Sequence, residues 1–186
     1  MITTNDLKNG MTLNYEDVLY EVLYFQHVKP GKGGAFVRTK LKNLYTGANI
    51  EKTFRAGEKV EQAILETKKM QFLYKDDHFN FMDNGTFEQI PISEEYIGEN
   101  EKFLLENMEV TIKFYKGNPI SIELPIAIES KVIETEPGAK GDTVSQSFKP
   151  AVIETGAKIQ VPIFINEGDI IKIDTRTGEY ITRVSK

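Results

Sequence analysis

Cysteine is absent from the 186-residue sequence, and histidine occurs only twice, as His27 and His78. A chain without cysteine forms no disulfide and has no thiolate nucleophile. The two histidines lie far apart in the sequence, and neither has a second His or Cys at the spacing of metal ligands. We therefore expect a protein that is not an enzyme, with no catalytic residue, no bound metal and no cofactor.

Long apolar runs are also absent, since no segment approaches the ~20 residues that a membrane-spanning helix needs. The first ten residues, MITTNDLKNG, have neither a basic region nor an apolar core, so we expect no signal peptide. Hydrophobic residues make up 40% and charged residues 27% of the chain, as is typical of globular proteins. These features, with the missing cysteine, predict a cytoplasmic protein without a membrane partner.

Short segments rich in β-branched and aromatic residues, bounded by Gly, Asn, Asp or Pro, predict a mostly β protein. Helical patterns are scarce: residues 58–66 fit two turns, and residues 99–108 fit about three. Many short strands with regular turns indicate small barrels or sandwiches, and the chain is long enough for several. The expected strands are 18–28, 35–44, 70–76, 108–115, 120–126, 157–165, 169–175 and 180–184.

Charge divides the chain into three parts. Residues 1–64 have 9 basic and 7 acidic residues, residues 65–127 have 6 and 12, and residues 128–186 have 8 and 9. The net charges are thus +2, -6 and -1. The shifts in composition predict domain boundaries near residues 65 and 128.

The first part contains a window without acidic residues, between Glu21 and Glu51. Within it Arg38, Lys40 and Lys42 alternate with uncharged residues, so a strand would place the three cations on one face. Alternating cations often form no more than a solvated face. In an acid-free window beside a lysine-bearing loop, we interpret them as a surface for a structured RNA, while the overall charge of -5 opposes indiscriminate binding.

The loop in this window, residues 29–36, has the sequence KPGKGGAF. Pro30 fixes one dihedral angle, and the glycines permit positive φ and close approach of another backbone. A P-loop would need Ser or Thr after its lysine and then a helix, whereas Lys32 is followed by glycine and a strand. The loop is therefore expected to be a hairpin with Lys32 at its tip.

Two stretches resemble the bacterial elongation factor P family. One is PGKGGAFVRTKLKNLYTG at 30–47, and the other is GDTVSQSFKPAVIETGAKIQVPIFINEGDIIKIDTRTGEYITR at 141–183. The resemblance runs from about Ile2 to the end without large insertions. It implies an SH3-like (KOW-like) barrel at 1–65, OB-fold barrels at 66–128 and 129–186, and an L-shaped arrangement that imitates tRNA.

The same resemblance implies a function. Family members enter ribosomes stalled on consecutive prolines, between the peptidyl-tRNA and exit sites, and stimulate peptide-bond formation by positioning the peptidyl-tRNA. The residue at Lys32 is extended in many members by a lysine-modifying enzyme and points to the peptidyl-transferase centre. Gly34 differs from the stiffer residue of some members that work unmodified, which favours a modified Lys32 here. We expect a monomer.

The resemblance also implies the contact residues. Tyr180 and Arg183 map to residues that lie near the small subunit, although strict alternation would put them on opposite strand faces, and Tyr180 would serve equally well as a core residue. The expected tRNA- and rRNA-binding residues are Lys29, Pro30, Gly31, Gly33, Gly34, Arg38, Lys40 and Lys42.

Two alternatives remain. One is the elongation factor P-like paralogue, against which the intact Lys32 loop argues. The other is a general OB-fold binder of single-stranded nucleic acid, which would need aromatic platforms in basic grooves. Phe79, Phe81 and Phe87 instead lie among acidic residues, where an anionic strand is repelled.

Overall fold

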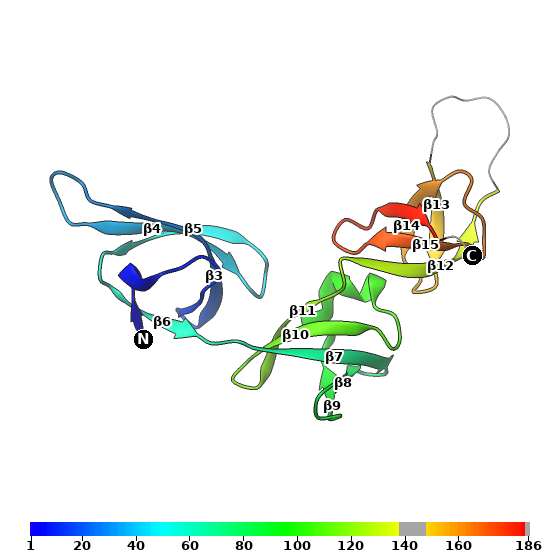
Figure 1. Ribbon diagram of the computed structural model, residues 1–186, viewed down its shortest axis with the longest axis horizontal. Helices are drawn as coiled ribbons and strands as arrows, with labels where there is room; N and C mark the ends of the chain where they lie inside the picture. The colour runs from blue at the N-terminus through cyan, green and yellow to red at the C-terminus, as the bar shows by residue number, and fades with distance from the viewer. Residues whose placement is uncertain (138–147, 185–186) are drawn as a thin grey trace. The chain divides into compact units, whose positions relative to one another are not determined.

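The computed structural model describes residues 1–137 and 148–184. The chain is nearly all-β, as predicted, and its strands form three sheets of six, five and five strands (Figure 1). The chain divides into two compact units, Met1–Lys68 with Ile112–Ser121, and Lys69–Thr111 with Ile122–Lys186. Among the described residues, no helix is long and apolar enough to cross a membrane. Residues 141–147 of the C-terminal signature lie outside the described residues.

The first sheet has the order β1-β6-β2-β3-β4-β5, and each pairing is antiparallel. Its strands curve around one apolar core, which includes Leu13, Val22 and Phe54. The 3-10 helix η1 (Thr4–Asp6) follows the first strand. The strands are β1 (Ile2–Thr3), β2 (Thr12–Tyr15), β3 (Val18–Val28), β4 (Phe36–Asn43), β5 (Asn49–Arg55) and β6 (Lys59–Ala63).

Strand β6 corrects the helix expected at 58–66. Val60 pairs with Ile2 of β1, and Ala63 pairs with Thr12 of β2, so the segment joins two neighbours in the sheet. The backbone hydrogen bonds of these two pairings outweigh the weak local preference of the segment for helix.

The second sheet has the order β11-β10-β7-β8-β9. Two short helices follow β9, α1 (Glu94–Ile97) and the 3-10 helix η2 (Gly98–Phe103), so the helix expected at 99–108 is shorter and begins earlier. The strands are β7 (Glu66–Lys75), β8 (Phe79–Asp83), β9 (Gln89–Ile92), β10 (Glu109–Tyr115) and β11 (Asn118–Glu123).

The end of the β10–β11 hairpin belongs to the first unit. Ile120 of β11 forms a buried cluster with Leu19 and Ala63 of the first sheet, and Tyr115 packs against this cluster. The boundary between the two units therefore crosses the strands of the second sheet.

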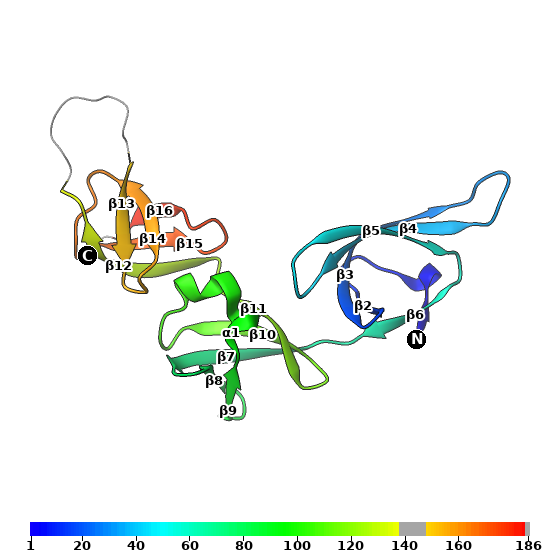
Figure 2. The ribbon, with the colours of Figure 1, turned by 180° about the vertical axis from the view of Figure 1, so that it is seen from behind.

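The third sheet has the order β14-β13-β12-β15-β16, with β16 labelled in Figure 2. Its core includes Val132, Ile153 and Ile171 and also receives Phe103 from the end of η2. The strands are β12 (Ala127–Thr135), β13 (Phe148–Ile153), β14 (Lys158–Pro162), β15 (Ile170–Asp174) and β16 (Tyr180–Arg183).

One type of turn occurs once in each sheet. It begins with Asn or Asp, has Thr at its fourth position and has a residue of positive φ at its fifth. The side-chain oxygen of the first turn residue accepts a hydrogen bond from the backbone N–H of the third residue. The hydroxyl of the threonine at the fourth position accepts one from the backbone N–H of the sixth residue. The turns are 43–48, 83–88 and 174–179. Because most of their hydrogen bonds are internal, such turns fix the register of the hairpins that they close.

We predict that the turn at 174–179 makes the free energy of unfolding depend on pH in the acidic range. Hydrogen bonds from Arg176 lower the pKa of the Asp174 carboxyl from 3.8 to about 2. Because the pKa is lower in the folded state, the carboxylate stabilises the fold above pH 3.8, and this contribution is lost as pH falls towards about 2. Urea unfolding of the wild type and of Asp174→Asn should show a stability difference that shrinks across this window. A difference that stays constant from pH 5 down to about 2 would contradict the assignment.

Candidate nucleic-acid interface

The lysine-bearing loop connects β3 and β4, the most extensively paired hairpin of the first sheet. Val28 pairs with Phe36, so the connection comprises residues 29–35. The loop extends beyond the rest of this sheet (Figure 1). The long pairing beneath it, which runs from Tyr20↔Asn43 to Val28↔Phe36, gives the loop a stable base.

Only one loop glycine has the backbone conformation that glycine favours. Gly33 has φ +112°, and a Cβ there would lie 3.8 Å from Cγ of Pro30. Gly31 and Gly34 have no such φ, and a Cβ at either position would meet no atom within 4 Å. The chain direction after Lys32 thus depends on Gly33, whereas Gly31 and Gly34 leave space around the tip.

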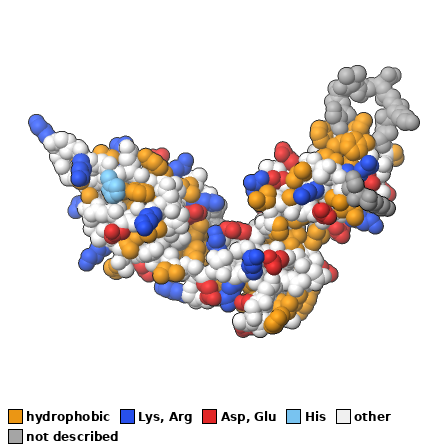
Figure 3. Space-filling view, in the orientation of Figure 1, with side chains coloured by type: hydrophobic (Ala, Val, Ile, Leu, Met, Phe, Trp, Pro, Cys, Tyr) orange, Lys and Arg blue, Asp and Glu red, His pale blue; other side chains and the backbone are white. Residues whose placement is uncertain are grey.

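Lys29 and Lys32 are both exposed in this loop. In the part of the chain that the structure describes, the Lys32 ammonium has no hydrogen-bond or salt-bridge partner. Figure 3 shows a cationic side chain at the far end of the loop. An ammonium there retains its three donors for a partner.

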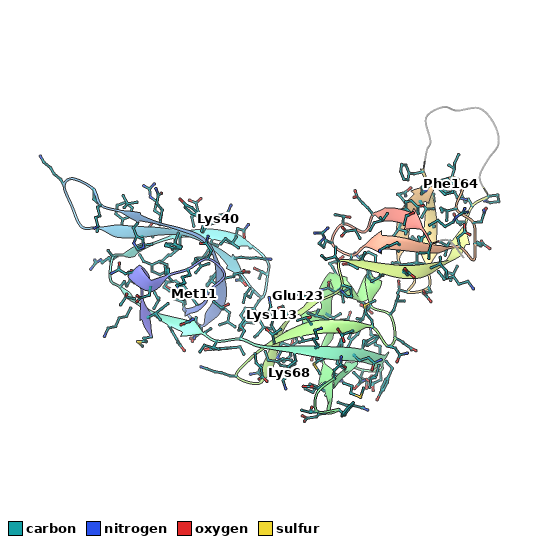
Figure 4. All side chains as sticks on the ribbon, in the orientation of Figure 1. Met11, Lys40, Lys68, Lys113, Glu123 and Phe164 are labelled. Carbon is teal, nitrogen blue, oxygen red and sulfur yellow. The ribbon has the colours of Figure 1, made fainter. Side chains whose placement is uncertain are left out.

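Strand β4 has the predicted alternation. Arg38, Lys40 and Lys42 are exposed, while the residues between them face the core. Figure 4 labels Lys40 on this strand. We call the three cations the β4 stripe.

The pairing of β4 adds a feature that the sequence did not indicate. Lys40 lies opposite Glu51 of β5, and Lys42 lies opposite Glu21 of β3. These are the two acidic residues that bound the window, so folding brings them beside one end of the stripe. Within residues 1–137 and 148–184, the stripe forms no salt bridge at 4.0 Å or less.

The other end of the stripe has a different environment. Arg38 lies between Gln26 and Thr53, and its guanidinium carbon is 5.5 Å from the ring centroid of Phe36. Positive charge is therefore least offset at the end of the stripe that adjoins the loop. We call Lys29, Lys32 and Arg38 the cationic surface. Net positive charge decreases along β4 from Arg38 towards Lys42.

The second candidate site lies on β16. The pairing of β15 with β16 shifts between Lys172 and Ile173, which leaves an extra residue in β16. Tyr180 then pairs with Ile173 and Arg183 pairs with Ile171. Since Ile171 and Ile173 share a face, this β-bulge puts Tyr180 and Arg183 on one face, which strict alternation would not.

The two β16 residues have unequal exposure. Tyr180 is half-buried and packs against the core of the third sheet, so the alternative of a core role applies to part of its ring. Arg183 is exposed, with its guanidinium 3.8 Å from the Asp169 carboxylate and 5.8 Å from the ring centroid of Phe164, which Figure 4 labels. Strand β16 thus presents part of the Tyr180 ring and the Arg183 guanidinium to solvent.

Other candidate residues are separated or buried. Phe79 and Phe81 are core residues, at 2% and 0% exposure, and only Phe87 is exposed, at 71%. They do not form a stacking platform for bases. Among the described residues, no group of three His, Asp or Glu is placed to hold a metal ion.

Three family models match the chain in succession, and together they define a translation factor with a KOW-like domain followed by an OB domain. They are "Elongation factor P (EF-P) KOW-like domain" at residues 3–60, "Elongation factor P (EF-P) OB domain" at 65–122 and "Elongation factor P, C-terminal" at 128–183. The chain belongs to the elongation factor P family.

Curated relatives support this over the full length. Elongation factor P of Symbiobacterium thermophilum is 59% identical over 184 residues, covering 98% of this chain and 100% of the relative. Elongation factor P of Natranaerobius thermophilus is 57% identical over 185 residues, covering 99% and 98%. The resemblance noted in the sequence is thereby confirmed, and the chain is a translation elongation factor.

Solved structures agree with the fold. "Eukaryotic translation initiation factor 5A from Methanococcus jannaschii" aligns with a TM-score of 0.52 and 28% identity, covering 66% of this chain and 91% of that one. A factor 5A family protein from Naegleria fowleri has the same TM-score at 14% identity and shows the fold alone. The predicted succession of SH3-like (KOW-like) and OB-type domains is confirmed, and the L-shaped arrangement stays a prediction.

We predict that the two glycines after Lys32 differ in their tolerance of a side chain. Gly33→Ala places a Cβ at φ +112° and should change the loop conformation, with amide chemical-shift changes across residues 30–36. Gly34→Ala is the matched control, and its changes should stay with its immediate neighbours. Both variants should melt within about 2–4 °C of wild type, since the loop lies outside the core. Equal spectral changes in the two variants would contradict the role given to Gly33.

Proposed function

We propose that the protein binds the ribosome between the peptidyl-tRNA and exit sites and stimulates peptide-bond formation, above all where consecutive prolines stall synthesis. Membership of the elongation factor P family over the full chain supports a place on the ribosome. The observation that carries the finer proposal is the position of Lys32, which is exposed at the end of a glycine loop and has no hydrogen-bond or salt-bridge partner among the described residues.

The protein acts by positioning and contributes no acid or base to the reaction. The loop enters the peptidyl-transferase centre, and the Lys32 ammonium donates hydrogen bonds to phosphate or ribose oxygens of the peptidyl-tRNA end. Holding this end in place lowers the entropic part of the barrier, which reaches about 7–11 kcal/mol in well-oriented systems. The ribosome already aligns most substrates, so the factor supplies a small fraction of that.

Lys32 is the substrate of a lysine-modifying enzyme that lengthens its side chain. The space around the tip supports this proposal, because a Cβ at Gly31 or Gly34 would meet no atom within 4 Å. A longer side chain carries the donors deeper into a narrow RNA cleft. Gly34 leaves the tip without the stiffening of a larger residue, and a modified side chain compensates by making additional contacts.

The cationic surface next to the loop binds rRNA and the acceptor arm of the tRNA. Lys29 and Arg38 make the strongest contacts, since Glu51 and Glu21 offset the charge of Lys40 and Lys42. Pro30, Gly31, Gly33 and Gly34 bring the backbone close to the nucleic acid.

The other two domains make further contacts with the ribosome. The protein acts as a monomer, and it acts in the cytoplasm. The domains are 1–65, 66–128 and 129–186. The break between β6 and β7 supports the first boundary, whereas the second falls within β12, just after the break between β11 and β12. The acidic middle domain imitates the charge of tRNA. Tyr180 and Arg183 contact the small subunit, a role supported by the bulge that places both on one face.

The proposal predicts that Lys32 is essential for function and not for folding. Lys32→Ala should melt within about 2–4 °C of wild type, because the side chain has no hydrogen-bond or salt-bridge partner in the described part of the chain. It should abolish rescue of a polyproline reporter in cells that lack the endogenous factor. Lys32→Arg keeps the charge but blocks lysine modification, so it should resemble Lys32→Ala. Lys59→Ala, at an exposed lysine of the same sheet, is the control and should rescue fully.

Two results would narrow this proposal. If Lys32→Arg and unmodified wild-type protein both rescue fully, charge at the tip suffices and the modification is unnecessary. If Lys32→Ala rescues fully, the loop has no positioning role.

The β4 stripe predicts a salt-dependent contribution to binding. Changing Arg38, Lys40 and Lys42 to Gln should weaken ribosome association and lower the slope of log affinity against log salt by up to about 3. Gln is preferred to Glu, because a carboxylate at 40 or 42 would face Glu51 or Glu21 directly. The control changes three exposed lysines of the third sheet, Lys131, Lys158 and Lys172, with the same loss of charge. An equal effect of both triple variants would mean that net charge alone matters.

A further inference from the structure

Phe87 departs from the pattern that the three equivalent turns share. It occupies the fifth position of the second turn with φ +61°, where the other two turns have Gly47 and Gly178, both with φ +72°. The hydrogen bonds around it are unchanged, since its N–H donates to the Asp83 carbonyl at 2.8 Å, as Gly47 and Gly178 donate to the first residues of their turns. The turn therefore requires a backbone with positive φ at this position, and its hydrogen bonds do not involve the side chain there.

This conformation is unfavourable for a bulky side chain. Positive φ is uncommon outside glycine, and the residues that adopt it most readily are Asn and Asp. Of the non-glycine residues with positive φ in the described part of the chain, Phe87 is the one aromatic. Backbone strain of this kind persists where the surrounding structure or a function requires it.

Packing does not account for the strain. Phe87 is 71% exposed, whereas Phe79 and Phe81 of the same sheet are buried. A phenylalanine with most of its ring in water contributes little to folding. Its ring is instead available to a partner.

The charge around the turn indicates what kind of partner. Glu88 follows Phe87 and is exposed, and Asn84 of the same turn donates a hydrogen bond at 3.0 Å to Glu109 of β10. Lys69 of β7 pairs with Glu109 at 3.4 Å, so the nearby cation is already engaged. Residues 65–127 as a whole carry a net charge of -6. Such a surface repels phosphate and attracts arginine and lysine.

We infer that Phe87 is a docking residue for a basic protein surface. The ring receives an arginine or lysine side chain of the partner over its face, while neighbouring carboxylates orient the cation. Aromatic residues are enriched in the centres of protein interfaces, where a rigid ring buries a large area at a low entropic cost. This inference rests on the proposed function, since the basic protein is one of the ribosome that the factor binds.

The first test separates function from folding. Phe87→Gly removes the ring and relieves the backbone, so its Tm should stay within about 2–4 °C of wild type or rise. Its affinity for ribosomes in a pelleting assay should fall about tenfold. Phe87→Asn also suits positive φ and should behave like the glycine variant, whereas Phe87→Tyr keeps the ring and should bind like wild type. Unchanged binding of Phe87→Gly, or a Tm lower by more than this range, would overturn the inference.

The second test identifies the class of partner. A photo-crosslinking benzoylphenylalanine replaces Phe87, and the full-length protein is irradiated on ribosomes. The expected product is an adduct with a ribosomal protein, at a peptide that contains arginine or lysine. An adduct with rRNA or tRNA, or no adduct from bound protein, would overturn the inference.

Wild-type protein in the same assay separates the two proposals. If the wild type fails to pellet with ribosomes, the proposed function fails. If the wild type binds and Phe87→Gly binds equally well, only the role of Phe87 fails.

Discussion

The two-residue period of β4 is the constraint on which the candidate site depends. Leu41, Val37 and Thr39 are buried against the core of the first sheet, so the residues between them must face outward. A shift of one residue would bury the β4 stripe and expose the core, and the core therefore fixes the direction of the cations. The same strand, paired with β3 through Val28↔Phe36, also carries the loop that bears Lys32. The burial of one face of β4 thus both stabilises the first domain and orients the cations of the proposed RNA contact.

Local patterns predicted most of this arrangement. The strand at 18–28, the alternation along β4 and the hairpin with Lys32 at its tip follow from side-chain periodicity and turn residues alone. The helix that the local pattern predicts at 58–66 is wrong, because the place of β6 between β1 and β2 depends on partners more than 40 residues away. The expected strands also omit β1, β2, β5, β8, β9, β12 and β13, for a related reason. These segments are short, polar or contain proline, and they become strands through cross-strand pairing, which no short window of sequence contains.

Two features of the site required three-dimensional register. Glu21 and Glu51 bound the acid-free window in the sequence, yet pairing returns them to one end of the stripe. The bulge in β16 brings Tyr180 and Arg183 to one face, and an unpaired residue in a strand leaves no clear mark in composition. Phe87 is similar, since its strain becomes visible only beside the turns at Gly47 and Gly178. Each of these features can be recognised only when segments that are distant in the sequence are compared in the folded structure.

The central claim is that the Lys32 loop reaches the end of the peptidyl-tRNA on the ribosome. The most direct measurement places a photo-crosslinking residue at Gly34, where a side chain has open space, and leaves Lys32 intact. The protein is then irradiated on ribosomes stalled within a run of prolines. Crosslinks to the acceptor end of the peptidyl-tRNA and to rRNA of the peptidyl-transferase centre are the predicted result. Crosslinks confined to the small subunit, or their absence from the tRNA of a bound complex, would contradict the account.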